Sequence, residues 1–174
     1  TGSVVGSPVC LCVFAIAALT NLASALLLAP ELAERITVVW LGGHPDAWPD
    51  GAEFNLRQDV AAVQVVLASG VPFVRIPCKN VAEHLRATVP EMAAYVRGRG
   101  GIGDYLFQIF SDYDNAGDRA GAAGWSKPVW DIACVAVAIT PEAFDFQVLP
   151  RPTLTDDLRW QPDSAGKPMT VALD

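Results

Sequence analysis

The sequence predicts an α/β protein with an open, mostly parallel sheet flanked by helices. Two observations support this class. Short apolar runs rich in β-branched residues recur along the chain, and segments of helical periodicity separate them. Strands that alternate with helices are typical of parallel sheets. Because ligands bind such sheets beyond the carboxyl ends of the strands, candidate functional residues are expected there.

The first predicted unit is a strand, a helix and a second strand. Residues 9–17 form a continuous apolar run, which indicates a strand buried on both faces of the sheet. Thr20 is expected to cap a helix over residues 21–35, with a break at Pro30. Residues 36–41 form a second β-branched run that ends in Gly42-Gly43.

The alternation continues through the rest of the chain. Residues 58–69 show a helical pattern that ends at Gly70, and residues 71–76 indicate a third strand. Further helices are predicted over residues 81–97, with a division at Pro90, over residues 102–113, and over residues 130–139. Residues 146–173 have the composition of strands and turns.

Composition limits the range of functions. The chain has 174 residues, of which 52% are hydrophobic, and we expect residues 1–174 to form a single α/β domain. Acidic side chains outnumber basic ones by 19 to 12, which gives a net charge of −7 and a pI near 4.7. A surface of this charge disfavours phosphate backbones, so nucleic acid is not an expected partner.

The apolar run over residues 9–28 is nearly long enough to span a membrane. No basic stretch precedes it, however, and Thr20-Asn21 interrupts it where a helix cap would sit, so no membrane association is expected. Four cysteines have no spacing suited to a zinc site and are interpreted as buried thiols, which favours a reducing compartment and hence the cytoplasm. They are Cys10, Cys12, Cys78 and Cys134.

A carboxylate and an amide follow the second predicted strand. Glu53 and Asn55 are two residues apart, so an extended chain would place both side chains on one face. Together they suit a polyhydroxylated ligand such as a sugar, because the carboxylate accepts hydrogen bonds and the amide both donates and accepts them. The alternative is that the two residues cap the next helix.

Trp130-Asp131 begins the last predicted helix, which is strongly apolar. A carboxylate in that position must be capped, paired or bound to a metal, and helix capping is the common explanation. One Asp alone would not make a calcium or magnesium site. His44 shares a loop with Trp48 and could line a site, although a solvated loop histidine is the simpler interpretation.

The run from Gly98 to Gly103 satisfies the G-x-G-x-x-G pattern of dinucleotide-binding loops. That motif uses its glycines in a turn from a strand to a helix. Here a predicted helix precedes the run, so a turn between two helices is expected.

Several blocks, taken in order, resemble the inosine-uridine type nucleoside hydrolase family. They are Leu19 to Ala23, Pro30 to Arg35, Gly42-Gly43, Ala52 to Asn55 with Asp59, and Trp130-Asp131. The resemblance spans about Val9 to Leu173. It implies a Rossmann-like α/β core and hydrolysis of the N-glycosidic bond of a ribonucleoside by a calcium-bound water, as in purine and pyrimidine salvage. It is also consistent with a homo-oligomer, a dimer or a tetramer.

The resemblance implies roles for individual residues. Glu53 matches the carboxylate that binds the ribose 5′-hydroxyl, and Asn55 matches the amide that holds the lower ribose hydroxyls. Asp131 matches a late calcium ligand, and Ile16 stands where the family offers calcium a main-chain carbonyl. Trp130 replaces a histidine found in many relatives and resembles a stacking platform for the base. His44 is a further candidate substrate contact.

Two departures from the family pattern affect the expected activity. Ala47 stands where better-known members carry an Asn, so substrate preference does not transfer. The family's Asp-rich strand, D-x-D-x-x-x-D-D, which supplies the general base and most calcium ligands, has no match in residues 1–8. We therefore expect an internal fragment or a shortened homologue, with the general base upstream and little hydrolysis by the isolated chain. The alternative function is a non-catalytic protein that binds a nucleoside or ribose, or forms a subunit interface.

Overall fold

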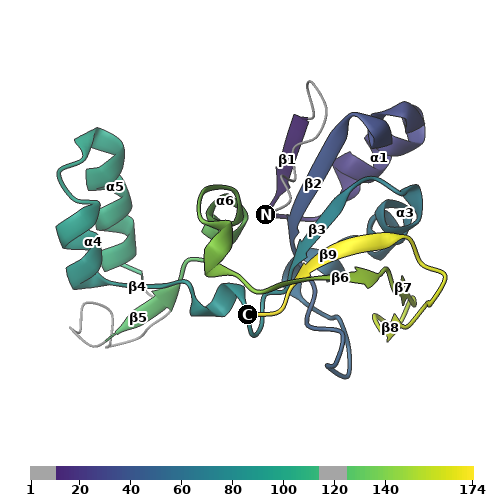
Figure 1. The fold of residues 1–174 in the computed structure, drawn as a ribbon. Coiled ribbons are helices and arrows are strands. Elements are labelled where there is room, and N and C mark those ends of the chain that lie inside the picture. The colour runs from purple at the N-terminus through teal and green to yellow at the C-terminus, as the bar shows by residue number, and fades with distance from the viewer. Residues whose placement is uncertain (1–10, 114–124) are drawn as a thin grey trace. The chain divides into compact units, whose positions relative to one another are not determined.

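A computed structural model describes residues 11–113 and 125–174, which form two compact units (Figure 1). The first contains the described residues of 1–82 and 130–174, and the second those of 83–129. Each unit is described by itself below. The expectation that residues 1–174 form one domain stays a prediction.

The first unit is built on a five-stranded sheet in the order β1-β2-β3-β9-β6. The first four strands run parallel to one another, and only β6 pairs antiparallel, with β9. This arrangement confirms the predicted mostly parallel sheet. The strands are β1 (Leu11–Ala15), β2 (Ile36–Leu41), β3 (Phe73–Ile76), β6 (Phe146–Pro150) and β9 (Pro168–Ala172).

Helices cover both faces of this sheet. On one face α1 (Thr20–Leu28) packs against α3 (Val60–Ser69), and both contribute to a core that includes Trp40 and Phe73. On the other face α6 (Ile132–Ile139) contacts β1 and β2, as Figure 1 shows. Two layers of helix around a buried sheet remove most apolar side chains of the central strands from water.

The N-terminal strand differs from the prediction. β1 forms one edge of the described sheet, and its side chains are largely exposed, with Leu11 63% and Phe14 41% exposed. The expected burial on both faces is therefore wrong within the described residues. Cys12, which lies in β1, is exposed rather than buried, whereas Cys78 and Cys134 are buried as predicted. Cys10 lies outside the described residues.

The helix after β1 also differs in detail. It ends at Leu28, and Pro30–Glu34 forms a separate 3₁₀-helix, which confirms the break at Pro30. Thr20 does not cap this helix. Its hydroxyl instead donates to the carboxylate of Asp59 (2.5 Å), and Asp59 caps α3 by accepting a hydrogen bond from the backbone N–H of Ala62 (2.9 Å). Thr20, which was predicted to cap α1, therefore links α1 to the N-terminus of α3.

The predicted helix over residues 81–97 is wrong in its first half. A 3₁₀-helix (Ala82–His84) instead crosses from the first unit into the second. Strand β4 (Arg86–Thr88) and helix α4 (Val89–Tyr95) follow it. Thr88 and Glu91 form a capping box, and Pro90 lies in the first turn, so proline starts this helix rather than divides it.

The rest of the second unit is a helix and a short strand. Helix α5 (Gly100–Ser111) packs against α4, and β5 (Ser126–Pro128) pairs antiparallel with β4. Gly98 lies in the turn between α4 and α5, and the other glycines of the run, Gly100, Gly101 and Gly103, lie at the start of α5, so the run joins two helices as predicted. Within the described ranges, no helix is long and apolar enough to cross a membrane.

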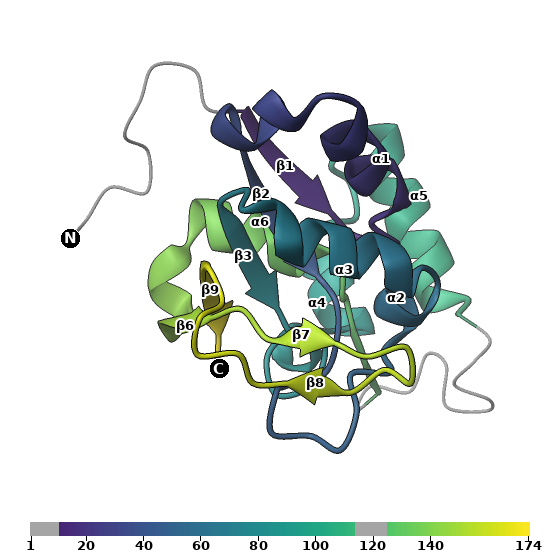
Figure 2. The same ribbon diagram turned by 90° about the vertical axis from the view of Figure 1, so that its right-hand side faces the viewer.

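The C-terminal segment forms strands and turns, as predicted. A small hairpin of β7 (Thr153–Leu154) and β8 (Trp160–Gln161) lies between β6 and β9 in the chain (Figure 2). Before the hairpin, the buried Arg151 donates to the carbonyl oxygens of Leu67 (3.2 Å) and Val71. This side chain satisfies carbonyls at the end of α3 and fixes the helix to the C-terminal strands.

Candidate functional site

One hollow in the first unit brings together most of the predicted site residues. It has a volume of about 440 Å³ and lies where β2 ends, after β3 and at the start of α6. This is the carboxyl edge of the parallel strands, where ligands bind to sheets of this kind. Its lining residues are Leu41, His44, Ala52, Glu53, Phe54, Asn55, Arg57, Cys78, Lys79, Trp130 and Asp131.

Glu53 is held in place by backbone donors. It is 8% exposed and precedes the short helix α2 (Phe54–Arg57) as its N-cap. One carboxylate oxygen, Oε2, accepts hydrogen bonds from the N–H groups of Gly43 (3.0 Å), Asn55 (2.9 Å) and Leu56 (3.2 Å). These three donors stabilise the buried charge and leave the other oxygen, Oε1, outside this set of bonds.

Asn55 is the second residue of α2 and is 7% exposed. Its side-chain Nδ2 donates to the carbonyl oxygen of Leu41 (2.9 Å), the last residue of β2. That bond fixes the amide at the end of the strand. Glu53 and Asn55 therefore line the hollow together, although Asn55 is helical and the predicted extended pairing is wrong. The capping alternative also holds for Glu53, since capping and lining are not exclusive.

His44 is half-buried in the loop after β2 and lines the same hollow. Its ring lies 4.9 Å from the ring of Trp48. The Nδ1 atom is buried and has no hydrogen-bond partner among the residues that the structure describes. Leaving a buried ring nitrogen without a partner costs free energy. His44 is a half-buried loop residue, and its role in a site stays a prediction.

Trp130 and Asp131 form the wall contributed by α6. Asp131 is the N-cap residue of that helix, but its side chain makes no capping hydrogen bond in the described part of the chain. The common explanation for an Asp in this position is therefore wrong here. Its carboxylate is exposed in the hollow, and the ring of Trp130 lies 5.8 Å from the Nζ of Lys79.

The described residues do not complete a metal site. No group of three or more His, Cys, Asp or Glu residues within residues 11–113 and 125–174 is placed to hold a metal ion. Asp131 supplies one carboxylate, whereas calcium takes about six to eight oxygen ligands. Ile16, predicted to offer a main-chain carbonyl, follows β1 and is 44% exposed, but it does not line the hollow. These residues alone do not fit calcium.

Three further residues line the hollow without a sequence pattern that predicts it. Arg57 is the last residue of α2, and Cys78 and Lys79 follow the end of β3. Burial raises the pKa of the Cys78 thiol well above its ordinary range, and the carboxylate of Glu53 raises it further. The thiol is therefore neutral at physiological pH and serves as a hydrogen-bonding group, not as a nucleophile.

A second hollow, of about 450 Å³, lies near the end of α3. It is lined by Gln64, Arg151 and Lys167, among others, and by none of the predicted site residues. Its one buried charge, Arg151, is occupied by backbone carbonyls. Because the first hollow is lined by five of the six predicted site residues, among them Asp131, whose carboxylate makes no capping bond in the described chain, we take it as the candidate site.

Comparisons with known proteins point to one family. A family model described as inosine-uridine preferring nucleoside hydrolase matches residues 5–172. RihB of Shigella boydii serotype 4 is 29% identical over 134 residues, which cover 74% of this chain and 54% of that protein. The pyrimidine-specific ribonucleoside hydrolase RihB of Escherichia coli O1:K1 / APEC is 28% identical, with 74% and 42% covered. The chain thus spans about half the length of these curated relatives.

Solved structures show the same fold. An inosine-uridine preferring nucleoside hydrolase from Bacillus anthracis superposes with a TM-score of 0.71 at 21% identity, over 97% of this chain and 56% of that one. The plant nucleoside hydrolase PpNRh1 superposes with a TM-score of 0.74 at 18% identity, over 94% of this chain and 57% of that one. Both likenesses concern the fold.

Proposed function

Because the chain belongs to the inosine-uridine preferring nucleoside hydrolase family, we propose that the protein hydrolyses ribonucleosides to ribose and free base. One observation on the site supports this proposal. Glu53, Asn55, Trp130 and Asp131 come from segments far apart in the sequence, yet they line a single hollow with His44. Its volume of about 440 Å³ falls in the range of small-ligand sites.

The proposed reaction makes distinct demands on the two ends of a nucleoside. The bond between C1′ of the ribose and the base nitrogen breaks, and its electron pair leaves with the base. Water adds its oxygen to C1′ and loses a proton, while the base gains one. Positive charge develops on the ribose ring as the bond breaks, so hydroxyl contacts that orient the ribose favour the reaction.

We propose that Glu53 and Asn55 bind the ribose. The carboxylate of Glu53 is fixed through Oε2 by three backbone N–H groups, so Oε1 is held in place to accept a hydrogen bond from the 5′-hydroxyl. The amide of Asn55 is fixed through Nδ2, which leaves its carbonyl oxygen to accept from the lower hydroxyls. Both assignments follow the family resemblance and agree with the hydrogen bonds.

We propose that Trp130 and His44 contact the base. An indole ring offers a flat apolar surface on which a purine or pyrimidine can stack. His44 lines the same hollow and is the proposed polar contact of the base. These are binding roles. No described residue is assigned as the general base.

Calcium belongs to the proposal as the source of an activated water. When bound, calcium lowers the pKa of water and orients oxygen ligands. We propose that Asp131 supplies one ligand, because its carboxylate is not used to cap α6. The described residues provide no complete ligand set, so no step is assigned to the ion.

The setting of the reaction is also a proposal. Buried free thiols at Cys78 and Cys134 suit a reducing compartment, which favours the cytoplasm and a role in nucleoside salvage. We further propose a homo-oligomer, a dimer or a tetramer. Size-exclusion chromatography with light scattering measures this directly, and a monomer at micromolar concentration would contradict it.

Hydrolysis is tested on the protein as its gene encodes it. Inosine, uridine and p-nitrophenyl riboside are incubated with calcium or with a chelator, and base release is followed. We expect turnover with calcium and its loss with the chelator. Turnover that persists in chelator would contradict the role of calcium alone. Binding of nucleosides without turnover would support the non-catalytic alternative and overturn the proposed activity.

A further inference from the structure

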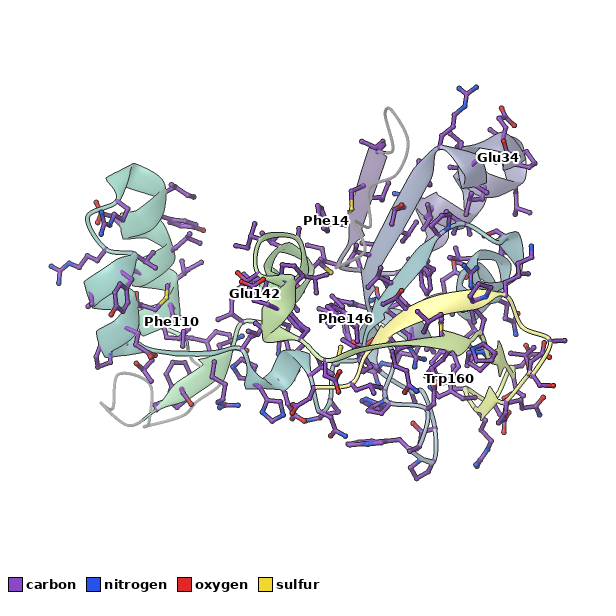
Figure 3. All side chains as sticks on the ribbon, in the orientation of Figure 1. Phe14, Glu34, Phe110, Glu142, Phe146 and Trp160 are labelled. Carbon is purple, nitrogen blue, oxygen red and sulfur yellow. The ribbon has the colours of Figure 1, made fainter. Side chains whose placement is uncertain are left out.

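The loop that carries His44 rests on a distant tryptophan. Trp160, labelled in Figure 3, is the first residue of β8. Its indole Nε1 donates a hydrogen bond to the carbonyl oxygen of His44 (3.1 Å). A Cβ atom added to Gly43 or to Gly51 would lie 2.9 Å from an atom of the same indole. The ring therefore touches both ends of the loop over residues 43–51 so closely that only glycine fits.

The hairpin that carries Trp160 bonds to the same loop. The backbone N–H of Gly51 donates to the carbonyl oxygen of Leu158 (2.7 Å), and the guanidinium of Arg159 donates to the carbonyl oxygen of Pro49 (3.3 Å). With the indole bond, three hydrogen bonds join the loop to the β7–β8 hairpin. Backbone groups of a surface loop need such partners when water is excluded.

The buried guanidinium of Arg75 contacts both the loop and Trp160. Arg75, in β3, is 1% exposed, and its guanidinium carbon lies 4.7 Å from the ring centroid of Trp160. It forms an ion pair with Asp46, which belongs to the loop. Desolvation lowers the pKa of Arg75, and the carboxylate of Asp46 opposes that effect. The side chain of Asp46 is 37% exposed, so the pair joins a buried cation in β3 to a surface carboxylate of the loop.

The supported loop leads directly to the ribose-binding residues. The backbone N–H of Gly43 is one of the three donors to Glu53 Oε2, and His44 follows it in the wall of the hollow. A shift of the loop would move one donor of the carboxylate and the partnerless Nδ1 of His44 together. Displacements of about 1 Å are enough to weaken binding and catalysis at such sites.

We propose that Trp160 is a positioning residue, which holds loop 43–51 so that Glu53 and His44 face the bound nucleoside. This inference rests on the proposed function. It assigns to the β7–β8 hairpin, which does not line the hollow, control over recognition of the 5′-hydroxyl end of the substrate.

The test compares Trp160→Phe with wild type on two substrates. One is the ribonucleoside that the protein hydrolyses fastest, and the other is its 5′-deoxy counterpart. The substitution removes the Nε1–H donor and keeps an aromatic ring. We expect kcat/KM for the ribonucleoside to fall about tenfold, as for one lost hydrogen bond. For the 5′-deoxy substrate we expect a clearly smaller fall, because the shift of His44 affects both substrates whereas Glu53 has no hydroxyl to bind in the 5′-deoxy one.

Two further variants complete the test. Trp125→Phe makes the same change in the second unit, where the indole packs on Phe110 (5.3 Å), and should leave both kcat/KM values unchanged. Asp46→Asn weakens the loop from the Arg75 side and should reproduce the selective loss if Trp160→Phe does not fold. Equal losses on both substrates would overturn the positioning role. A wild type that hydrolyses neither substrate would instead overturn the proposed function.

Discussion

Glu53 combines a structural and a proposed binding task in one carboxylate. Oε2 caps α2 and accepts the N–H of Gly43, which ties the helix to the end of β2. The same bonds fix the position of the whole carboxylate in the wall of the hollow. Substitution at this position is therefore expected to change stability and affinity together.

Glu53→Gln tests that expectation. The neutral amide accepts from the backbone N–H groups less strongly than the carboxylate, so we expect a loss of about 1–3 kcal/mol in unfolding free energy. Nucleoside affinity, measured by calorimetry, should fall about tenfold. Glu142→Gln makes the same change at an exposed glutamate and should alter neither quantity. Full affinity in Glu53→Gln would rule out the proposed 5′-hydroxyl contact.

Asp131→Ala should behave in the opposite way. Because the side chain makes no capping bond within the described chain, unfolding free energy should change by less than about 1 kcal/mol, a helix-dipole contribution. Calcium-dependent hydrolysis should be abolished if Asp131 is a ligand. Denaturant unfolding and base release measure the two effects. Unchanged turnover would refute the metal assignment.

At the scale of elements, α1 and α3 are joined through Thr20 and Asp59. The hydrogen bond from Thr20 is the largest cause of the lowered pKa of Asp59, followed by the backbone bond from Ala62. A carboxyl group with a lowered folded pKa stabilises the fold above its ordinary pKa of 3.8 and loses that effect as the pH falls through the folded value.

Asp59→Ala is expected to lower the unfolding free energy by about 1 kcal/mol at pH 7, as for other helix caps. Asp59→Asn keeps a capping acceptor and should cost less. Urea unfolding at pH 7 and below pH 3 measures both, and the difference between wild type and Asp59→Ala should shrink in acid. A constant difference would exclude the carboxylate as its source.

Predictions of single elements succeeded where the local pattern determined the outcome. Residues 36–41 were predicted as a strand and form β2, because a β-branched run between a helix end and a glycine pair has one plausible state. The prediction of one helix over residues 81–97 fails before Val89, because the apolar periodicity continues across Thr88 although the helix does not. The pattern of Thr88, Pro90 and Glu91 is a capping box with an early proline, and it marks the true start of α4.

Only part of the candidate site could be predicted from the sequence. Glu53, Asn55, Trp130 and Asp131 could be found because each sits in a short block that resembles a known family. Trp160 could not, since its bond to His44 joins residues 116 positions apart and leaves no local signal. Burial of β1 was also mispredicted, because an apolar run does not reveal whether a strand lies at an edge.

At the scale of the whole molecule, buried thiols are expected to lower the unfolding free energy as the pH rises into the alkaline range. Burial raises the pKa of Cys134 to about 12 from an ordinary 9.0. Above pH 9 the unfolded chain loses this proton while the folded chain keeps it, so the unfolded state is favoured as the pH rises toward 12. Below pH 9 this group has no such effect.

Cys134→Ala should therefore reduce the loss of stability between pH 8 and pH 10.5. Urea unfolding at the two pH values gives the difference for each protein. Cys12→Ala removes an exposed thiol that is a minor cause of the raised pKa of Cys134, so it should change the pH dependence much less than Cys134→Ala does. An identical slope in Cys134→Ala would show that its ionisation is not linked to unfolding.

The contact between Trp160 and His44 also constrains the order in which the molecule can be made. During synthesis β2 and the loop after it leave the ribosome long before residue 160 is added. Until then, Gly43 and Gly51 lack the indole on which they rest, and the carbonyl of His44 lacks its donor. Contacts of high sequence separation form late because loop closure must precede them. The nascent chain can therefore pair β1, β2 and β3 before it can recognise a ligand.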